Sequence, residues 1–333
     1  MRARRLTLLV FKGACITAGS LFFCGDRGIA DESLPHVTFV AWNLRNYLHT
    51  GGAAPPAAPR ETKPKPASEV EAVTRILASL RPDIAGICEV GSPEDLSALQ
   101  QRLKSAGLDL PHSECVAAAD ADRHLALLSR HPIAARNSQT QLHYLLDESK
   151  LPVQRGILDV TIQITPDYFL RCVGVHLKSR RDVPEANEAL MRRNEAHLLR
   201  QYADTILTAN PDVNLLVYGD FNDTRDEPSV KAISGMRGSE NYLTALTPVD
   251  TAGQRWTYYF SESDTYSRID YLLASKGLNP EIDDAKCLIY PGADWLSASD
   301  HRAITAVIRP VEKVRRAGKP SLPAKKSLEH SAR

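Results

Sequence analysis

The chain has 333 residues, of which 43% are apolar and 24% are charged. This composition can bury one large core or two modest ones, and it excludes a fibrous or wholly disordered chain. The first 30 residues hold five basic residues and one acidic residue, and Arg309–Arg333 hold eight basic and two acidic residues. The body between them therefore carries 28 basic and 37 acidic residues, a net charge of −9 with histidine neutral. A body of that sign excludes strong non-specific binding of duplex nucleic acid through a basic face.

Both ends of the chain are predicted to lie outside the folded domain, which we expect to span residues 31–310. Residues 1–30 resemble a signal peptide, with arginines ahead of an apolar run and a small-residue cleavage site at Gly28-Ile29-Ala30. An uncleaved anchor stays open as the alternative. No later run is long and apolar enough to span a bilayer, so we expect a protein exported to the periplasm or the medium. The composition of residues 311–333 predicts a basic, disordered tail, or else an arm that binds polyanions.

The N-terminal part of the body predicts a strand, a long loop and a helix. Residues 37–42 are expected to form the strand, and Gly51–Ala67 is a proline-rich loop. Ser68 and Glu71 form a capping-box pattern, and apolar residues at helical spacing then predict a helix that ends before Pro82.

The rest of the body mixes strands and helices without strict alternation. The predicted strands are residues 84–88, 157–164, 169–175, 213–218, 256–260, 269–274, 287–290 and 304–308. The predicted helices are residues 96–103 and 185–209. Such a mixture is typical of two packed sheets with helices on their outer faces.

Four predicted strands lead directly into polar residues. Those residues are Asn43, Glu89, His176 and the Gly219-Asp220-Phe221-Asn222-Asp223 stretch. Asp270 and Ser299-Asp300-His301-Arg302 complete the set near the C-terminus. Because active-site side chains are often presented at strand ends, we expect these residues to meet.

Four cysteines follow the export signal, and none has the short paired spacing of a zinc site or a redox dithiol. Cys88 and Cys172 fall in predicted strands and are expected to be buried core residues. Whether an exported protein would oxidise one pair is left open by the sequence.

In order and flanking context, the polar motifs resemble those of the endonuclease/exonuclease/phosphatase superfamily over roughly residues 35–310. The superfamily includes pancreatic-type deoxyribonucleases, abasic-site endonucleases, bacterial sphingomyelinases and inositol-polyphosphate phosphatases. The resemblance rests on Asn43, Glu89, His176, Gly219–Asp223, Arg268–Tyr271 and Ser299–His301. It implies an α/β fold, a four-layered α/β/β/α sandwich of two mixed β-sheets flanked by helices, together with magnesium and hydrolysis of a phosphate ester.

The residue types fit that chemistry. Phosphodiester hydrolysis needs a hard cation held by oxygen ligands, and Glu89, with Asn43 and Asp300 directly or through water, can supply them to Mg²⁺, for which Mn²⁺ could substitute. In-line attack needs a water that has lost a proton. Asp220 is the candidate base, and Asn222 would orient the water or a phosphate oxygen.

Two histidines are expected to act on the phosphate. His301 can donate to a phosphoryl oxygen while Asp270 holds its other ring nitrogen and raises its pKa. His176 would supply a second imidazole, and which of the two is the acid stays open. Lys178 and Arg268 are candidate substrate contacts, with a solvated surface residue and a structural ion pair as the respective alternatives.

The motifs leave the substrate open. We expect a phosphodiester substrate, and we favour an exported nuclease or phosphodiesterase. A phosphatase or phospholipid-head-group hydrolase is the alternative. DNA, RNA, phospholipid and inositol phosphate all stay open as substrates. Leu44-Arg45-Asn46-Tyr47 stands where abasic-site enzymes carry a tryptophan-containing insertion, which disfavours that activity. The aromatic stretch Trp256–Phe260 is assigned to a buried strand rather than a membrane-docking hairpin. A non-catalytic binding module is the remote alternative, and no stable protein partner is inferred.

Overall fold

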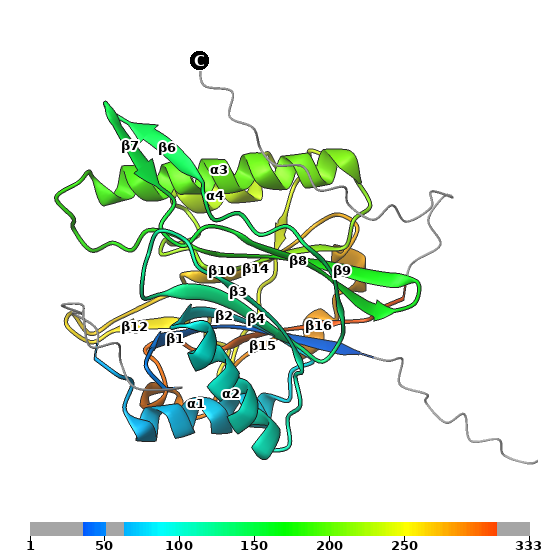
Figure 1. Ribbon diagram of the computed structural model, residues 1–333. Coiled ribbons are helices and arrows are strands. Elements are labelled where there is room, and N and C mark those ends of the chain that lie inside the picture. Colours follow the sequence, from blue (N-terminus) through cyan, green and yellow to red (C-terminus); the bar gives the residue numbers. More distant parts are fainter. Residues whose placement is uncertain (1–35, 51–62, 312–333) are drawn as a thin grey trace, which may run out of the picture. The chain divides into compact units, whose positions relative to one another are not determined.

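The computed structural model describes residues 36–50 and 63–311 (Figure 1). The predicted signal peptide, most of the proline-rich loop and nearly all of the predicted tail lie outside the described residues. Among the helices of the described part, none is both long and apolar enough to cross a membrane.

Two six-stranded mixed sheets form the centre of the fold. The first sheet contains, in spatial order, β15 (Leu288–Ile289), β16 (Ile304–Ile308), β1 (Val37–Tyr47), β2 (Ile84–Val90), β4 (His124–Ser129) and β3 (His112–Val116). The second sheet contains β11 (Thr244–Ala245), β14 (Asp270–Ala274), β10 (Leu215–Asp220), β9 (Tyr168–His176), β8 (Leu158–Thr165) and β5 (Ile133–Arg136). Two hairpins stand outside these sheets, β6 (His143–Leu146) with β7 (Ser149–Pro152) and β12 (Tyr258–Phe260) with β13 (Thr265–Ser267).

Helices cover the outer face of each sheet. Figure 1 shows α1 (Ala67–Leu80) and α2 (Pro93–Ser105) against the first sheet, and α3 (Glu188–Ala209) and α4 (Pro228–Ser234) against the second. Three hydrophobic cores fill the spaces between the four layers, one between the sheets and one under each helix pair. The predicted α/β fold with two packed mixed sheets is therefore confirmed.

Strand β10 illustrates how the sequence builds these layers. Leu216 and Tyr218 belong to the core between the sheets, whereas Leu215 and Val217 belong to the core under α3 and α4. Because successive side chains of a strand point to opposite faces, a strand covered on both faces has a continuous apolar run. The run that precedes Asp220 is thus explained by burial on both sides.

Tyr218 fills the centre of the fold. Its ring packs edge-on against Phe39 with centroids 4.9 Å apart. A Cβ atom added at Gly86 would lie 2.1 Å from Tyr218 Cε2, and one at Gly174 would lie 2.6 Å from Cζ. The Tyr218 ring therefore fits only because neither glycine has a side chain.

The capping box predicted at Ser68 and Glu71 is wrong. Helix α1 begins at Ala67, and its N-cap is Pro66, which makes no side-chain capping bond. The proline already fixes the backbone ahead of the helix, so Ser68 falls inside the first turn. A capping box occurs instead at α2, where Ser92 and Asp95 bond reciprocally.

The buried strand predicted for residues 256–260 is also wrong. Only Tyr258–Phe260 is a strand, and it belongs to the β12–β13 hairpin, in which Tyr258 and Tyr259 are half-buried and Phe260 is exposed. Alternation in so short an aromatic segment does not distinguish a core strand from a surface hairpin. Cys88 and Cys172 are buried as predicted, and the four cysteines of the described residues are free thiols.

Tyr218 gives a test of the central core. Its hydroxyl is buried without a hydrogen-bond partner among the described residues. We expect Tyr218→Ala to lower the free energy of unfolding by about 3–5 kcal/mol, because it leaves a large cavity. Tyr218→Phe should be neutral or slightly stabilising, because it removes an unsatisfied polar atom. Urea denaturation measures both variants, and equal losses for the two would contradict this packing.

Candidate active site

Strand register places three predicted site residues in one row, at the ends of three neighbouring strands of the second sheet. His176 in β9 pairs with Asp220 in parallel β10, and Asp220 pairs with Asp270 in antiparallel β14. Gly219, which precedes Asp220, has a φ of +136°, and a Cβ there would lie 1.9 Å from the carbonyl oxygen of Val175. Only glycine fits this position, and it allows the close strand contact that delivers Asp220.

The first sheet supplies the other predicted residues. Asn43 in β1 pairs with Cys88 in β2, directly before Glu89. Asp300 and His301 lie just ahead of β16. The Ser299 hydroxyl fastens that segment to β1, since Oγ donates to the carbonyl of Asn43 at 2.8 Å and accepts from the backbone N–H of His301 at 3.0 Å.

Asn43 joins the two sheets. Its Nδ2 donates to Oδ2 of Asp220 at 3.0 Å and to Oε1 of Glu89 at 3.2 Å. The same Oδ2 of Asp220 lies 3.6 Å from Nε2 of His176 and 3.7 Å from Nε2 of His301. Asp220 is therefore the point at which both sheets and both imidazoles meet.

His301 and Asp270 form a buried pair. Nδ1 of His301 lies 2.9 Å from Oδ2 of Asp270. The hydroxyl of Thr257 accepts from the backbone N–H groups of Ile269 and Asp270, both at 3.1 Å, and so fixes the start of β14. Burial alone would lower the pKa of His301, but the carboxylates of Asp270 and Asp220 raise it to about 10. The imidazole is therefore charged at neutral pH.

His176, in contrast to His301, is uncharged. Burial, followed by the nearby Arg155, lowers its pKa to about 3, so this imidazole is neutral at pH 7. Its Nε2 faces the carboxylates of Asp220 and Glu89, while its Nδ1 is buried without a hydrogen-bond partner among the described residues. A proton on Nε2 satisfies this geometry, because that nitrogen faces two acceptors.

The two site carboxylates also differ. Burial raises the pKa of Asp220 to about 7; the charge of His301 opposes this shift and Asp270 adds to it. Burial also acts to raise the pKa of Glu89, but the charges of His176 and Arg123 lower it to about 2. Arg123 supplies that charge at neutral pH, where His176 is uncharged. Asp220 can thus exchange a proton near pH 7, whereas Glu89 stays ionised.

The backbone around the site is strained. Four non-glycine residues near it have positive φ angles: Arg45, Asn46, Glu89 and Asn222. Such conformations cost energy and persist where surrounding contacts hold them. The backbone N–H of Asn222 donates to Oδ1 of Asp220 at 2.8 Å, and its Nδ2 donates to the carbonyl of Leu177 at 2.9 Å. These bonds hold Asn222 beside Asp220, as the motif predicts.

Two arginines that the sequence did not single out lie at the rim of the site. Nε of Arg123 donates to Oδ1 of Asn46 at 2.7 Å and lies 3.9 Å from Glu89. Nε of Arg45 lies 3.8 Å from Asp300. Arg45 could have been found from its place after Asn43, but Arg123 precedes β4 outside any motif. Together they bring local positive charge to a body that is acidic overall.

Lys178 and Arg268, the predicted substrate contacts, are occupied by other partners. Nζ of Lys178 is turned toward the backbone carbonyls of Ser179 and Arg181, at 3.1 and 2.8 Å. Nη2 of Arg268 donates to the carbonyl of Leu246 at 2.6 Å, and its guanidinium lies 5.3 Å from the ring centroid of Tyr271. Lys178 is buried, so the solvated-surface alternative is wrong for it. The contacts of Arg268 are structural, but they are with a carbonyl and a ring and do not form the expected ion pair.

Buried charges on α3 support the loop that follows His176. Oε2 of Glu195 accepts from the backbone N–H of Lys178 at 2.6 Å. Nη1 of Arg192 donates to the carbonyl of Lys178 at 3.1 Å, and its Nε lies 2.9 Å from Oδ2 of Asp223. One turn of α3 therefore links the loop after His176 to the loop after Asp220.

The site residues suit a hard cation. Glu89 is a half-buried carboxylate that stays ionised, as a metal ligand must. Asn43 beside it and Asp300 at the rim add oxygen atoms of the kind that Mg²⁺ binds. Ligand atoms of Asp220, Asp270 and His301 also lie within 4.8 Å of one another. We assign that trio to hydrogen bonding, because Nδ1 of His301 is already engaged by Asp270.

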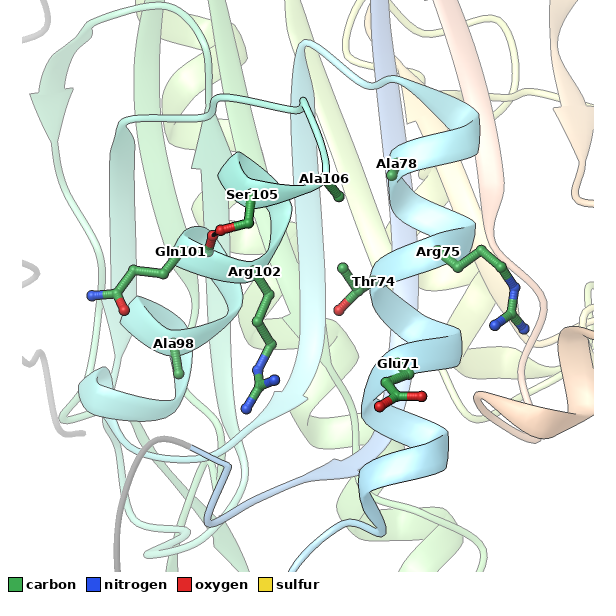
Figure 2. Close-up of a pocket in the computed structure, with 9 residues that line it drawn as sticks. All are labelled: Glu71, Thr74, Arg75, Ala78, Ala98, Gln101, Arg102, Ser105 and Ala106. Atoms are coloured by element: carbon green, nitrogen blue, oxygen red, sulfur yellow. Dashed lines mark hydrogen bonds between the residues drawn. The ribbon is translucent and has the colours of Figure 1, made fainter.

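A groove among the described residues lies elsewhere, between α1 and α2, with a volume of about 740 Å³ (Figure 2). Figure 2 shows Thr74 from α1 and Arg102 from α2 pointing into it. None of the predicted site residues lines this groove.

Comparison with known proteins agrees with this geometry. A family model described as the Endonuclease/Exonuclease/phosphatase family matches residues 40–301. No curated protein sequence matches the chain.

Several solved structures share the fold at low sequence identity. Truncated TDP2 from Caenorhabditis elegans is 16% identical with a TM-score of 0.54, covering 82% of this chain and 97% of that one. The human Nocturnin catalytic domain with bound sulfate anion is 16% identical with a TM-score of 0.57, covering 82% and 94%. Sphingomyelinase C from Streptomyces griseocarneus is 14% identical with a TM-score of 0.53, covering 82% and 99%.

Glu195 gives a pH-dependent test of the support behind the site. Burial raises its pKa to about 7, against the pull of Arg155 and of the Lys178 N–H. A folded-state pKa above the unfolded value gives stability that is present below pH 4.5 and is lost as the pH rises through 7. We expect the wild type to lose up to about 3 kcal/mol of unfolding free energy over this interval, and Glu195→Gln to keep it. Denaturation curves across the interval measure the difference; parallel pH profiles would contradict the assignment.

Proposed function

The chain belongs to the Endonuclease/Exonuclease/phosphatase family, and on that basis we propose that it is a magnesium-dependent phosphodiesterase that cleaves nucleic acid. Members of the family are generally metal-dependent hydrolases of phosphodiesters. The observation that carries the proposal is the convergence of both sheets on Asp220, which has a proton-accepting pKa near 7 beside a charged His301 and an ionised Glu89.

Asp220 is the proposed general base. A base works best when its pKa lies near the operating pH, and burial brings Asp220 to that range. It would take a proton from a water molecule, whose oxygen then forms the new bond to phosphorus while the bond to the leaving oxygen breaks. Asn222, held beside Asp220 by its own N–H, would orient that water.

His301 is the proposed proton-carrying group. Its charged imidazole can bind a non-bridging oxygen and return a proton to the leaving oxygen, while Asp270 fixes its tautomer and orientation. His176 is neutral, so it is better suited to donate a hydrogen bond than to give up a proton. The charge difference between the two imidazoles supports His301 as the acid.

Glu89, Asn43 and Asp300 would hold the magnesium ion. When bound, the ion would offset the negative charge that develops on the phosphoryl oxygens. Arg123 and Arg45, close to Glu89 and Asp300, would complete a local positive rim that attracts an anionic strand to an acidic body. Residues 1–30 support the further proposal that the protein acts after export.

Removal of the base is the direct test. The purified protein is incubated with Mg²⁺ and plasmid DNA, RNA, bis-nitrophenyl phosphate, sphingomyelin or inositol phosphates. We expect Asp220→Asn to lower kcat at least about a hundredfold, because a general base is lost. Asp226→Asn, an exposed aspartate on the following loop, is the matched control and should keep full activity. Excess chelator should abolish hydrolysis, and Mg²⁺ or Mn²⁺ should restore it.

Each arm of that experiment can contradict one part of the proposal. Full activity in Asp220→Asn would remove Asp220 from the chemistry. Activity that persists in excess chelator would remove the metal. Hydrolysis confined to sphingomyelin or inositol phosphates would keep the mechanism and replace the substrate.

A further inference from the structure

The β12–β13 hairpin is fastened to the segment that carries His301. The backbone N–H of Tyr259 donates to the carbonyl of Asp300 at 3.0 Å, and the N–H of Arg302 donates to the carbonyl of Thr257 at 2.7 Å. These two bonds flank His301 on either side. The hairpin therefore holds a fixed position relative to the proposed reaction centre.

One face of the hairpin continues the site outward as a row of rings. Tyr258 and Phe260 lie on the same face because they are two residues apart in a strand. Their ring centroids are 6.4 Å apart and their planes differ by 22°, and the Tyr258 ring lies 4.7 Å from that of His301. Exposure rises along the row, from 5% for buried His301 to 38% for Phe260.

The aromatic side chains of the opposite face already pack on one another. Tyr259 stacks on its cross-strand partner Tyr266 with centroids 4.7 Å apart, and Trp256 packs on Tyr266 at 4.8 Å and on Trp295 at 5.2 Å. The guanidinium of Arg302 lies 4.0 Å from the Trp256 ring centroid. Among the described residues, Phe260 stacks only on Tyr258, and part of its ring is open to solvent.

We propose that the face formed by Tyr258 and Phe260 is a stacking subsite for the nucleobase next to the scissile phosphate. This inference rests on the proposed function. A phosphate at His301 places the neighbouring nucleoside on the row of rings, where a base can stack on Phe260. Stacking on an aromatic side chain suits any base, because every base has a planar π-face. The subsite would favour unpaired strands, since a base inside a duplex is already stacked on its neighbours.

The charge of the hairpin tip favours a base over a lipid surface. The tip carries Glu262 and Asp264, both exposed, and Asp264 accepts a hydrogen bond from the hydroxyl of Tyr259 at 2.9 Å. Insertion of this tip into a bilayer would bury two carboxylates, which is costly. An uncharged base can lie beside them.

The test compares two ligands that differ only in the base. Binding of adenosine 5′-monophosphate and of ribose 5-phosphate to the full chain is measured by calorimetry in the presence of Mg²⁺. We expect the nucleotide to bind about tenfold more tightly. Phe260→Ala should remove that advantage and leave the affinity for ribose 5-phosphate unchanged, because one stacking contact is lost. Phe260→Trp should retain it.

Tyr266→Ala is the matched control. Tyr266 is an aromatic residue of the same hairpin, 54% exposed, on the opposite face. We expect it to leave the preference for the nucleotide intact. An equal loss in Tyr266→Ala and Phe260→Ala would attribute the effect to hairpin stability and overturn the subsite. Equal wild-type affinity for the two ligands would overturn it as well, as would binding to phosphatidylcholine vesicles that Phe260→Ala abolishes.

Failure of the subsite and failure of the proposed function give different results. Metal-dependent hydrolysis without any preference for the nucleotide would reject the subsite and keep the phosphodiesterase. A tenfold preference in a protein that hydrolyses no phosphodiester would reject catalysis and keep the subsite.

Discussion

The site depends on the buried carboxylate of Asp220 and on the groups that contact it. A carboxylate removed from water is costly unless hydrogen-bond donors and positive charge surround it. Here Asn43 donates from the first sheet, the N–H of Asn222 donates from the following loop, and two imidazoles approach within 4 Å. These groups are also the ones that the proposed hydrolysis uses. The stability of the junction and the proposed chemistry therefore depend on the same atoms.

The two-sheet architecture explains how distant residues reach this point. Register across β9, β10 and β14 aligns three ionisable residues, and Gly219 permits the strand contact that the alignment needs. On the other sheet, Ser299 ties the segment before β16 to β1. Tyr218 fills the space between the sheets directly behind the site. The packing that holds the sheets together thus also fixes the distances around Asp220.

The sequence predicted the parts of the site that lie at strand ends, because apolar runs that lead into polar residues are visible without a structure. Asn43, Glu89, Asp220 and Asp270 lie together as their motifs predict, although their chemical roles stay predictions. Residues that support the site were missed because no local pattern marks them. Arg123, directly before β4, lies beside Glu89, and Glu195 of α3 accepts a hydrogen bond from the loop after His176. The β12–β13 hairpin was misassigned because its short aromatic segment fits a core strand equally well.

The proposed chemistry depends on a charge pattern around Asp220, with His301 protonated and His176 neutral at pH 7. Nitrogen-15 NMR of the metal-free protein measures both imidazoles directly across a pH titration. We expect His301 to stay protonated to about pH 10 and His176 to be already neutral at pH 5. We also expect Asp270→Asn to lower the pKa of His301, because the carboxylate in contact with Nδ1 is removed. Two histidines that both titrate near pH 6.5, unaffected by Asp270→Asn, would contradict this charge pattern.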